Sequence, residues 1–513
     1  MKSKRIFLPL FLIFIFLLAA VDYSKKVADL VDLGEFLKSH TISDFSYKTY
    51  VEGAISGMLA TLDPHSTFLN EEEYRRMKEE QKGKFYGVGM IISQRNGKIT
   101  VIAPIANTPA ARAGIRSGDI IYAINGESTE GMNVNDAVSK LRGKKGTKVV
   151  ITIKRPGYKK LLTFTIIRAE IPERTVEYAF MVDKSTGYIL LKSFGEKTGK
   201  EMYNALLKLK SQGMQKLVLD LRNNPGGLLG SAIIVSDLFL PKGDLIVYVK
   251  GRGEKERQDF FARNNFGFED IPLIVLINRG SASGSEIVAG AIQDNDRGLL
   301  VGKTSWGKGL VQSIFEIDKK MALALTTAKY YTPSGRCIQR DYKTSFGDYF
   351  NPQIQTQDEK NKNKPKFKTT KLGRTVYGGG GITPDYEVDS GKLSDFLVKL
   401  RFRDSAFFRF AVEFTNTHKH IKRSFVADKK VIIQFKAFLR KNDIDFTEKD
   451  IKNNIDYIKA LIEQEVLNIK FGLAEGAKRY LKIDRQFQKA IKLFPESKAL
   501  YEKAIKSGQK KKK

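Results

Sequence analysis

The sequence predicts a multidomain α/β protein, and three observations lead to that class. The chain has 513 residues, 42% of them hydrophobic, which is enough for roughly three or four domains with apolar cores. Residues 170–342 alternate apolar strand-like runs with helical patterns, which is typical of a sheet covered by helices. Residues 22–82 and 391–513 have helical periodicity instead, so we expect helical segments at both ends.

The scarcity of cysteine and histidine excludes several kinds of site. Cys337 is the single cysteine, so the chain can form neither an internal disulfide nor a cysteine-based zinc cluster. The four histidines leave positions 66–417 without any. A hydrolase in that stretch must take its general base from another residue type, and we expect no metal and no cofactor.

The first 21 residues have the pattern of an export signal. Basic residues within positions 2–5 precede an apolar run over 6–21, as in a signal peptide or an uncleaved signal anchor. Cleavage after Ala20 would place Leu18 where a small residue is preferred, so both interpretations stay open. We expect an exported, periplasmic or extracytoplasmic protein, either free or anchored to the inner membrane.

The chain is strongly basic, with 88 Lys and Arg against 57 Asp and Glu and a net charge of +31. Residues 391–513 hold 30 of the basic and 15 of the acidic residues. Such a field favours anionic partners such as lipid headgroups, although a solvated basic surface also explains it. The expected export and the lack of a nucleic-acid-binding motif argue against nucleic acid as a binding partner. The lysine-rich residues 343–375 predict a flexible loop, and residues 376–390 a segment that returns to the core.

Residues 83–169 predict a small domain of short strands with two helices. A glycine-containing loop at 86–89 runs into a strand, and further strands and helices follow in order up to 153. This segment resembles a PDZ domain. The resemblance implies that the loop binds the free C-terminal carboxylate of a substrate, with an apolar last residue. The residues of this loop are Tyr86, Gly87, Val88 and Gly89.

Within the α/β region, a glycine-rich loop follows a strand predicted at 216–220. Further strands are predicted at 187–191 and 272–278, with helices at 200–210 and 285–292. Gly226 and Gly227 end the stretch Asp220-Leu-Arg-Asn-Asn-Pro-Gly-Gly. Paired glycines there allow backbone N–H groups to face a cavity, although a plain tight turn needs them as well.

A serine-rich loop connects the strand at 272–278 with the helix at 285–292. A hydroxyl at a helix N-terminus lies beside unpaired N–H groups and the positive end of the helix, which suits a nucleophile. An N-cap serine is the alternative explanation. Ser281, Ser283 and Ser285 are the hydroxyls that this loop offers.

A lysine between two glycines follows, in Thr304-Ser-Trp-Gly-Lys-Gly-Leu-Val-Gln312. In an extended chain Lys308 and Gln312 share one face, so the carboxamide can orient the amine. A lysine acts as a base only when neutral, so its pKa must be lowered by burial. An ordinary turn lysine is the alternative.

Together these segments resemble the C-terminal processing peptidases, or tail-specific proteases. The spacings of 25 residues from Ser283 to Lys308 and four to Gln312 carry the resemblance, as do Leu-Asp-Pro-His-Ser at 62–66 and Gly-Gly-Gly-Ile-Thr-Pro-Asp at 379–385. It covers residues 30–390 and implies a crotonase-like β/α protease core with a PDZ domain upstream of it. It also implies an exported serine endopeptidase that cleaves near the C-terminal tail of a protein or peptide.

The resemblance assigns a role to each candidate residue. Ser283 is the nucleophile, Lys308 the general base and later acid, and Gln312 the residue that positions Lys308. The oxyanion hole consists of the N–H of Gly284 and that of either Gly226 or Gly227. The alternative is a catalytically inactive PDZ-containing protein that binds tails as a scaffold, and a homo-oligomer is compatible with either.

Overall fold

The computed structural model describes residues 29–510, with gaps at 30, 43, 45, 254–256, 343–348 and 351–363. The predicted export signal at 1–21 lies outside the described residues. The chain divides into a smaller unit, which contains the residues up to Arg75 together with Gln312–Thr326, and a larger unit with the rest. No helix within the described ranges is long and apolar enough to cross a membrane.

The smaller unit combines helices with a short antiparallel sheet. It contains a helix at 31–40, α2 (Tyr47–Ala60), β1 (Thr67–Leu69) and the beginning of α3 (Glu71–Lys82). β1 pairs with β18 (Ala322–Tyr331), which in turn pairs with β17 (Leu310–Glu316). The helical segment predicted over 22–82 is therefore interrupted by β1, because a three-residue strand is too short to show a period in the sequence.

The centre of the larger unit is a six-stranded sheet. Its strands are, in spatial order, β10 (Val176–Met181), β11 (Thr186–Leu191), β12 (Lys216–Asp220), β15 (Leu273–Ile277), β16 (Leu299–Gly302) and β21 (Tyr386–Glu387). All neighbours from β11 to β21 are parallel, and only β10 runs antiparallel to its partner. The predicted α/β class and the strands predicted at 187–191, 216–220 and 272–278 are confirmed.

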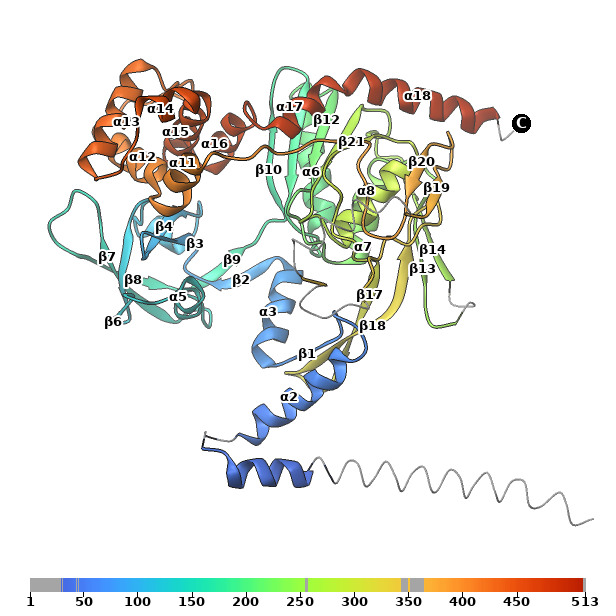
Figure 1. Cartoon of the computed structure of the whole chain (residues 1–513), viewed down its shortest axis with the longest axis horizontal. Helices are drawn as coiled ribbons and strands as arrows, with labels where there is room; N and C mark the ends of the chain where they lie inside the picture. Colours follow the sequence, from blue (N-terminus) through green and yellow to red (C-terminus); the bar gives the residue numbers. More distant parts are fainter. Residues whose placement is uncertain are drawn as a thin grey trace, which may run out of the picture. The chain divides into compact units, whose positions relative to one another are not determined.

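Helices cover both faces of this sheet (Figure 1). One face packs against α6 (Thr198–Ser211), α7 (Leu229–Asp237) and α8 (Gly284–Asp294), and the other against α17 (Arg485–Lys492) and α18 (Phe494–Lys510). Alternate residues of β12 serve the two layers, because Leu217 and Leu219 face the first while Val218 faces the second.

Additional strands lie beside this core. β13 (Leu245–Lys250) pairs with β14 (Arg257–Phe261) and with the end of β18. β19 (Lys366–Lys368) pairs with β20 (Thr375–Tyr377). The flexible loop predicted over 343–375 therefore does not extend to 375, because Lys366 and Lys368 lie on β19 and Lys371 pairs with Asp244.

Residues 84–172 form the expected domain of short strands. Its elements are β2 (Lys84–Gly87), β3 (Met90–Arg95), β4 (Lys98–Pro104), α4 (Pro109–Arg112), β5 (Ile120–Ile124), β6 (Glu127–Ser128), α5 (Val134–Leu141), β7 (Lys148–Lys154), β8 (Leu162–Ile167) and β9 (Ala169–Pro172). β3, β4, β5, β7 and β8 form one antiparallel sheet, and β2 pairs with β9. An apolar core of its own lies under this sheet.

The C-terminal region is helical, as predicted, but it divides into two parts. The first part is a bundle with its own core and consists of α11 (Asp395–Val398), a π-helix (Lys399–Arg403), α12 (Ala406–Thr417), α13 (Lys429–Lys441), α14 (Glu448–Asn453), α15 (Ile455–Phe471) and α16 (Leu473–Tyr480). The second part, α17 and α18, is a layer of the central sheet. Periodicity identified the helices but could not show which surface each apolar stripe would cover.

Candidate active site

The loops predicted to form the site leave the same edge of the central sheet. β12 and β15 are parallel neighbours, with Asp220 opposite Leu276 in the register. The glycine-rich loop therefore begins beside the serine-rich loop. Contacts between the two are close: a Cβ atom added to Gly226 would lie 2.7 Å from the Cβ of Ser283.

Ser283 occupies a sharp turn between β15 and α8. Its φ and ψ of 52° and −112° are unusual for a residue with a side chain, and such strain is concentrated at functional sites. Ser283 is half-buried, whereas Ser281 and Ser285 are fully buried. The latter two hydroxyls donate to the carbonyl oxygens of Leu221 and Asn224, so they hold the two loops together.

Glu286 connects the serine-rich loop with the segment that contains Lys308. Its Oε2 accepts the N–H of Ser283 at 2.8 Å and the N–H of Lys308 at 2.9 Å. Its Oε1 accepts the N–H of Gly307 at 2.7 Å and the hydroxyl of Ser305 at 2.5 Å. Two nitrogens that donate to one oxygen lie no more than about 6 Å apart. The structure therefore brings the backbones of Ser283 and Lys308 together.

The Glu286 carboxyl is fully buried, and this burial changes its acidity. Removal from water raises the pKa of Glu286 to about 7, while the hydroxyl of Ser305 and the three backbone N–H groups oppose the rise. Glu286 is not among the site residues predicted from the sequence, although the spacing Ser-x-x-Glu at a helix start is a recognised capping pattern.

Tyr330 holds the same two residues from their carbonyl side. Its hydroxyl, on β18, donates to the carbonyl oxygen of Lys308 at 2.6 Å and to that of Ser283 at 3.2 Å. The side chain is almost fully buried, and burial raises the pKa of Tyr330 well above its ordinary value, so the hydroxyl stays a donor. No local sequence signal marks this residue, because the fold alone brings it to the site.

The glycines differ in what their N–H groups do. The N–H of Gly226 donates to Oδ1 of Asn224 at 2.9 Å. Within the described residues the N–H groups of Gly227 and Gly284 have no acceptor, and Gly227 is exposed. Of the two predicted alternatives, this geometry favours Gly227 as the second oxyanion donor.

Gln312 lies on β17, within the smaller unit. Its carboxamide nitrogen donates to the carbonyl oxygen of His65 at 3.0 Å. His65 lies in a turn, as predicted, and this turn is organised by Asp63, whose carboxylate accepts the N–H groups of His65 and Ser66. The role of Gln312 in positioning Lys308 stays a prediction. Lys308 itself is half-buried.

The predicted tail-binding loop is largely buried. Gly87, Val88 and Gly89 are buried and Tyr86 is half-buried, and the carbonyl of Gly89 accepts the N–H of Ile105. Within the described residues, the N–H groups of Val88 and Gly89 have no acceptor, as a carboxylate-binding loop requires.

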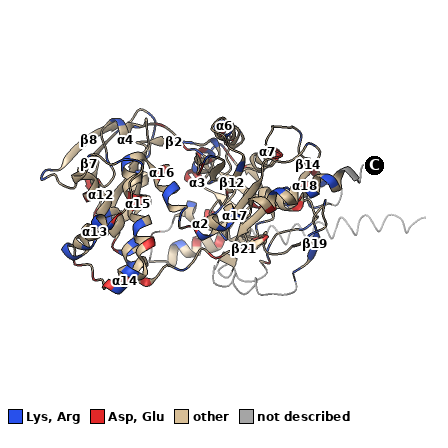
Figure 2. Cartoon of the chain, turned by 90° about the horizontal axis from the view of Figure 1, so that it is seen from above, with Lys and Arg blue, Asp and Glu red and all other residues tan. Residues whose placement is uncertain are grey.

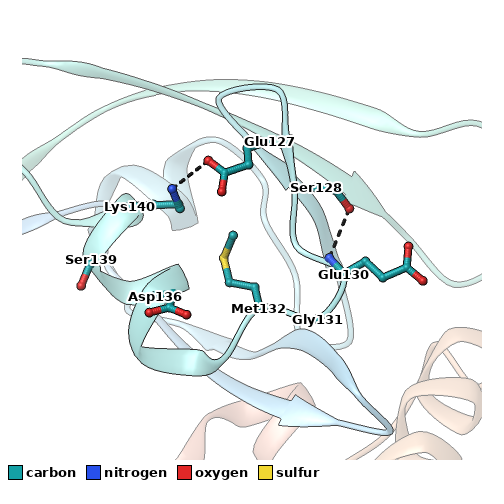
Figure 3. Close-up of a pocket in the computed structure, with 8 residues that line it drawn as sticks. All are labelled: Glu127, Ser128, Glu130, Gly131, Met132, Asp136, Ser139 and Lys140. Atoms are coloured by element: carbon teal, nitrogen blue, oxygen red, sulfur yellow. Dashed lines mark hydrogen bonds and ion pairs between the residues drawn. The ribbon is translucent and has the colours of Figure 1, made fainter. Parts of the chain in front are cut away.

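A separate hollow of about 570 Å³ lies between β6 and α5 of the same domain (Figure 3). Lys140 reaches across it to Glu127 at 2.7 Å, and Glu130 and Asp136 add two further acidic groups. Met132 is its only large apolar side chain, so the hollow does not suit an apolar tail. The described residues hold no cluster of side chains that could bind a metal ion.

Known proteins resemble this chain in the region of the central sheet and in the domain of short strands. A model of peptidase family S41 matches residues 185–345, and a PDZ domain model matches residues 100–155. The carboxy-terminal-processing protease of Bartonella bacilliformis is 42% identical over 319 residues, which cover 61% of this chain and 73% of that protein. The chain belongs to the carboxy-terminal processing proteases. It is a serine peptidase whose PDZ domain binds peptide or protein substrates.

This carboxy-terminal processing protease is similar to further proteins. Carboxy-terminal processing protease CtpA of Bacillus subtilis is 40% identical over 304 residues, 58% of this chain and 64% of the relative. Among solved structures, the photosystem II D1 C-terminal processing protease is 26% identical, with a TM-score of 0.37, and the match covers 68% of this chain and 84% of that one.

Proposed function

We propose that this protease uses Ser283 as nucleophile and Lys308 as general base, and that it is an exported enzyme that cleaves near the C-terminal tail of its substrates. The shared carboxylate of Glu286 carries the assignment of the two residues, because one oxygen atom accepts both of their N–H groups. The burial of Ser281 and Ser285, whose hydroxyls are already engaged, supports Ser283 over its neighbours.

The reaction follows from these positions. Neutral Lys308 accepts the proton of the Ser283 hydroxyl as Oγ bonds to the substrate carbonyl carbon. The N–H groups of Gly227 and Gly284 stabilise the oxyanion. The lysine then gives its proton to the departing amine as the C–N bond breaks. A water molecule, deprotonated by Lys308, hydrolyses the ester, and the proton returns to Oγ. Gln312 orients the amine of Lys308.

The PDZ loop supplies the selectivity for tails. The N–H groups of Val88 and Gly89 donate hydrogen bonds to the free carboxylate of the substrate, and an apolar last residue packs beside β3. A peptide with a free apolar C-terminus should therefore have a lower KM than the same peptide with a C-terminal amide. Equal KM values for the two peptides would contradict this part of the proposal.

Export is supported by the order of residues 1–21, in which basic residues precede an apolar run. A fusion of residues 1–40 to a reporter that is active only outside the cytoplasm tests it. Basic and acidic residues are interspersed along the C-terminal bundle (Figure 2). Within it, Lys436 pairs with Glu448 and Lys441 pairs with Glu413. Membrane association would therefore rest on the N-terminal segment more than on this bundle.

Homo-oligomerisation is supported by large apolar side chains that the smaller unit exposes. Val31, Phe36, Val51 and Met58 are each at least half exposed. Light scattering coupled to size exclusion tests it, and a monomer at every concentration would contradict it.

The decisive experiment compares the full chain with Ser283→Ala and Lys308→Ala on one peptide that has an apolar tail. Both variants should be inactive but folded, whereas Lys303→Ala, a lysine on the same connection that pairs with Glu387, should keep its activity. Full activity of Ser283→Ala would refute the assignment. A serine-directed covalent probe separates this proposal from an inactive scaffold, because a scaffold would not be labelled.

A further inference from the structure

The last two helices of the chain reach the glycine-rich loop through one arginine. Asp484 is the N-cap of α17, and its Oδ1 accepts the N–H of Phe487 at 3.0 Å. Its other oxygen lies 2.7 Å from Nη2 of Arg222, at the beginning of the glycine-rich loop. The side chain of Asp484 is 8% exposed, so this ion pair is largely shielded from solvent.

Every nitrogen of the Arg222 guanidinium has a hydrogen-bond partner. Asp220 accepts its Nε at 3.0 Å and its Nη2 at 2.6 Å, and Gln486 accepts its Nη1 at 2.9 Å. Gln486 is itself fixed, because its Nε2 donates to the carbonyl of Val388 at 2.9 Å. A planar guanidinium with this many partners has one permitted orientation.

The orientation of Arg222 bears on the loop that follows it. Asn224, two residues later, is fully buried, and its side chain donates to the carbonyl of Leu191 and accepts the N–H of Gly226. Three of the next residues, Asn223, Gly226 and Gly227, have positive φ, so the path of the loop is not set by regular secondary structure. Hydrogen bonds from neighbouring segments and from side chains at both ends of the loop set its path instead.

The serine-rich loop supplies the contacts on one side. The carboxamide of Asn278 accepts the backbone N–H of Asn223 and donates to the side-chain oxygen of Asn223. Ala282 donates its N–H to the carbonyl of Asn224. On the other side, Phe194 donates its N–H to the carbonyl of Gly226 and accepts the N–H of Leu228. The beginning of the loop is held from α17, where Asp484 and Gln486 bind Arg222.

We propose that Asp484 and Gln486 are positioning residues for the oxyanion hole. They fix Arg222, Arg222 fixes the beginning of the glycine-rich loop, and the loop places the N–H of Gly227 at the substrate carbonyl. The final helices of the chain are thus part of the catalytic apparatus, although they lie outside residues 185–345 that match the peptidase family model. This inference rests on the proposed role of Gly227.

A purely structural role explains the arrangement less well. α17 already packs on the sheet through Phe487, which is 1% exposed, and α18 through Phe494. A shielded ion pair adds little net stability, and apolar residues in its place often stabilise a protein more. A polar contact between α17 and the glycine-rich loop is explained if its role is to orient Arg222 for catalysis rather than to stabilise the fold.

Asp484→Asn tests the proposal in the full chain. Asparagine is as good an N-cap as aspartate, so α17 keeps its start while Arg222 loses a charged partner. We expect kcat on a peptide substrate to fall on the order of tenfold, with KM changed less than twofold. Asp484→Glu, which keeps the charge, should restore part of kcat. Asp428→Asn makes the same change at the N-cap of α13, where no active-site contact exists, and should leave kcat unchanged.

The outcomes separate this inference from the proposed function. If Ser283→Ala is inactive but Asp484→Asn keeps the kcat of the unaltered protein, the positioning role is refuted and the catalytic assignment stands. If Asp484→Asn and Phe487→Ala lose kcat in proportion to their loss of thermal stability, the role is structural and the inference is also refuted. Should Asp484→Asn not fold, Gln486→Met removes the other contact and should lower kcat about threefold; no change there refutes the inference.

Discussion

The buried carboxyl of Glu286 makes stability depend on pH in a way that one substitution should abolish. The pKa of Glu286 is about 7 in the folded protein and about 4.5 in an unfolded chain, so folding favours its protonated form. The stabilising contribution is fully present below pH 4.5 and is lost as the pH rises to 7. A difference of this size corresponds to about 3 kcal/mol in the free energy of unfolding.

Glu286→Gln removes this titration, and the hydrogen bonds of Glu286 indicate how much stability the substitution costs. The amide nitrogen can face the hydroxyl of Ser305, which is able to accept, while the amide oxygen keeps the N–H groups of Ser283 and Lys308. The N–H of Gly307 then loses its acceptor, at a cost of about 1–3 kcal/mol. The variant should be less stable than the unaltered protein at pH 4.5 and should approach or exceed its stability at pH 8.

Denaturant unfolding of both proteins between pH 4.5 and pH 8 measures this difference. Other titrating groups cancel, because both proteins contain them. Glu387→Gln, which alters a carboxylate that is 58% exposed, should run parallel to the unaltered protein. A stability difference between Glu286→Gln and the unaltered protein that stays constant across this range would refute the reasoning.

Three further predictions follow from contacts at the site and in the core. Tyr330→Phe removes the hydroxyl that donates to the carbonyl of Lys308, so it should lower kcat about tenfold and the free energy of unfolding by about 1 kcal/mol. The control Tyr331→Phe should change neither quantity. Equal kcat values for Tyr330→Phe and the unaltered protein would contradict the role of the hydroxyl. Gly227→Ala places a Cβ atom 2.1 Å from the carbonyl oxygen of Phe194 and should abolish peptide cleavage, which an active variant would disprove. Phe487→Ala should cost about 3–5 kcal/mol in denaturant unfolding, and a loss below 1 kcal/mol would show that α17 is dispensable for the sheet.

The sequence predicts the elements that position the site, because those elements are regular. Apolar β-branched runs identify β12 and β15, and the carboxyl ends of parallel strands lie at one edge. Glycine pairs and serine at a helix start then predict which loops meet there. The approach of Gly226 to Ser283 agrees with this expectation.

What the sequence could not predict depends on contacts between distant residues. Tyr330 reaches Lys308 across 22 positions and Asp484 reaches Arg222 across 262, and neither pair has a periodic pattern. β1 and β19 are too short to be recognised by alternation, and the lysines around β19 look like a solvated loop. The capping position of Glu286 can be recognised in the sequence. Its contact with Lys308 cannot, because Lys308 lies on a different connection between strands.

The position of α17 in the chain has a consequence for when the enzyme becomes active. Ribosomes deliver a polypeptide from its amino end, and domains fold as they emerge. The face of the sheet that packs against α17 and α18 stays uncovered, and Arg222 stays without Asp484, until residues 484–510 have been made. If Asp484 positions the oxyanion hole as proposed, a nascent chain that stops before this residue carries Ser283 and Lys308 without that support, and we expect it to cleave peptides more slowly than the full chain.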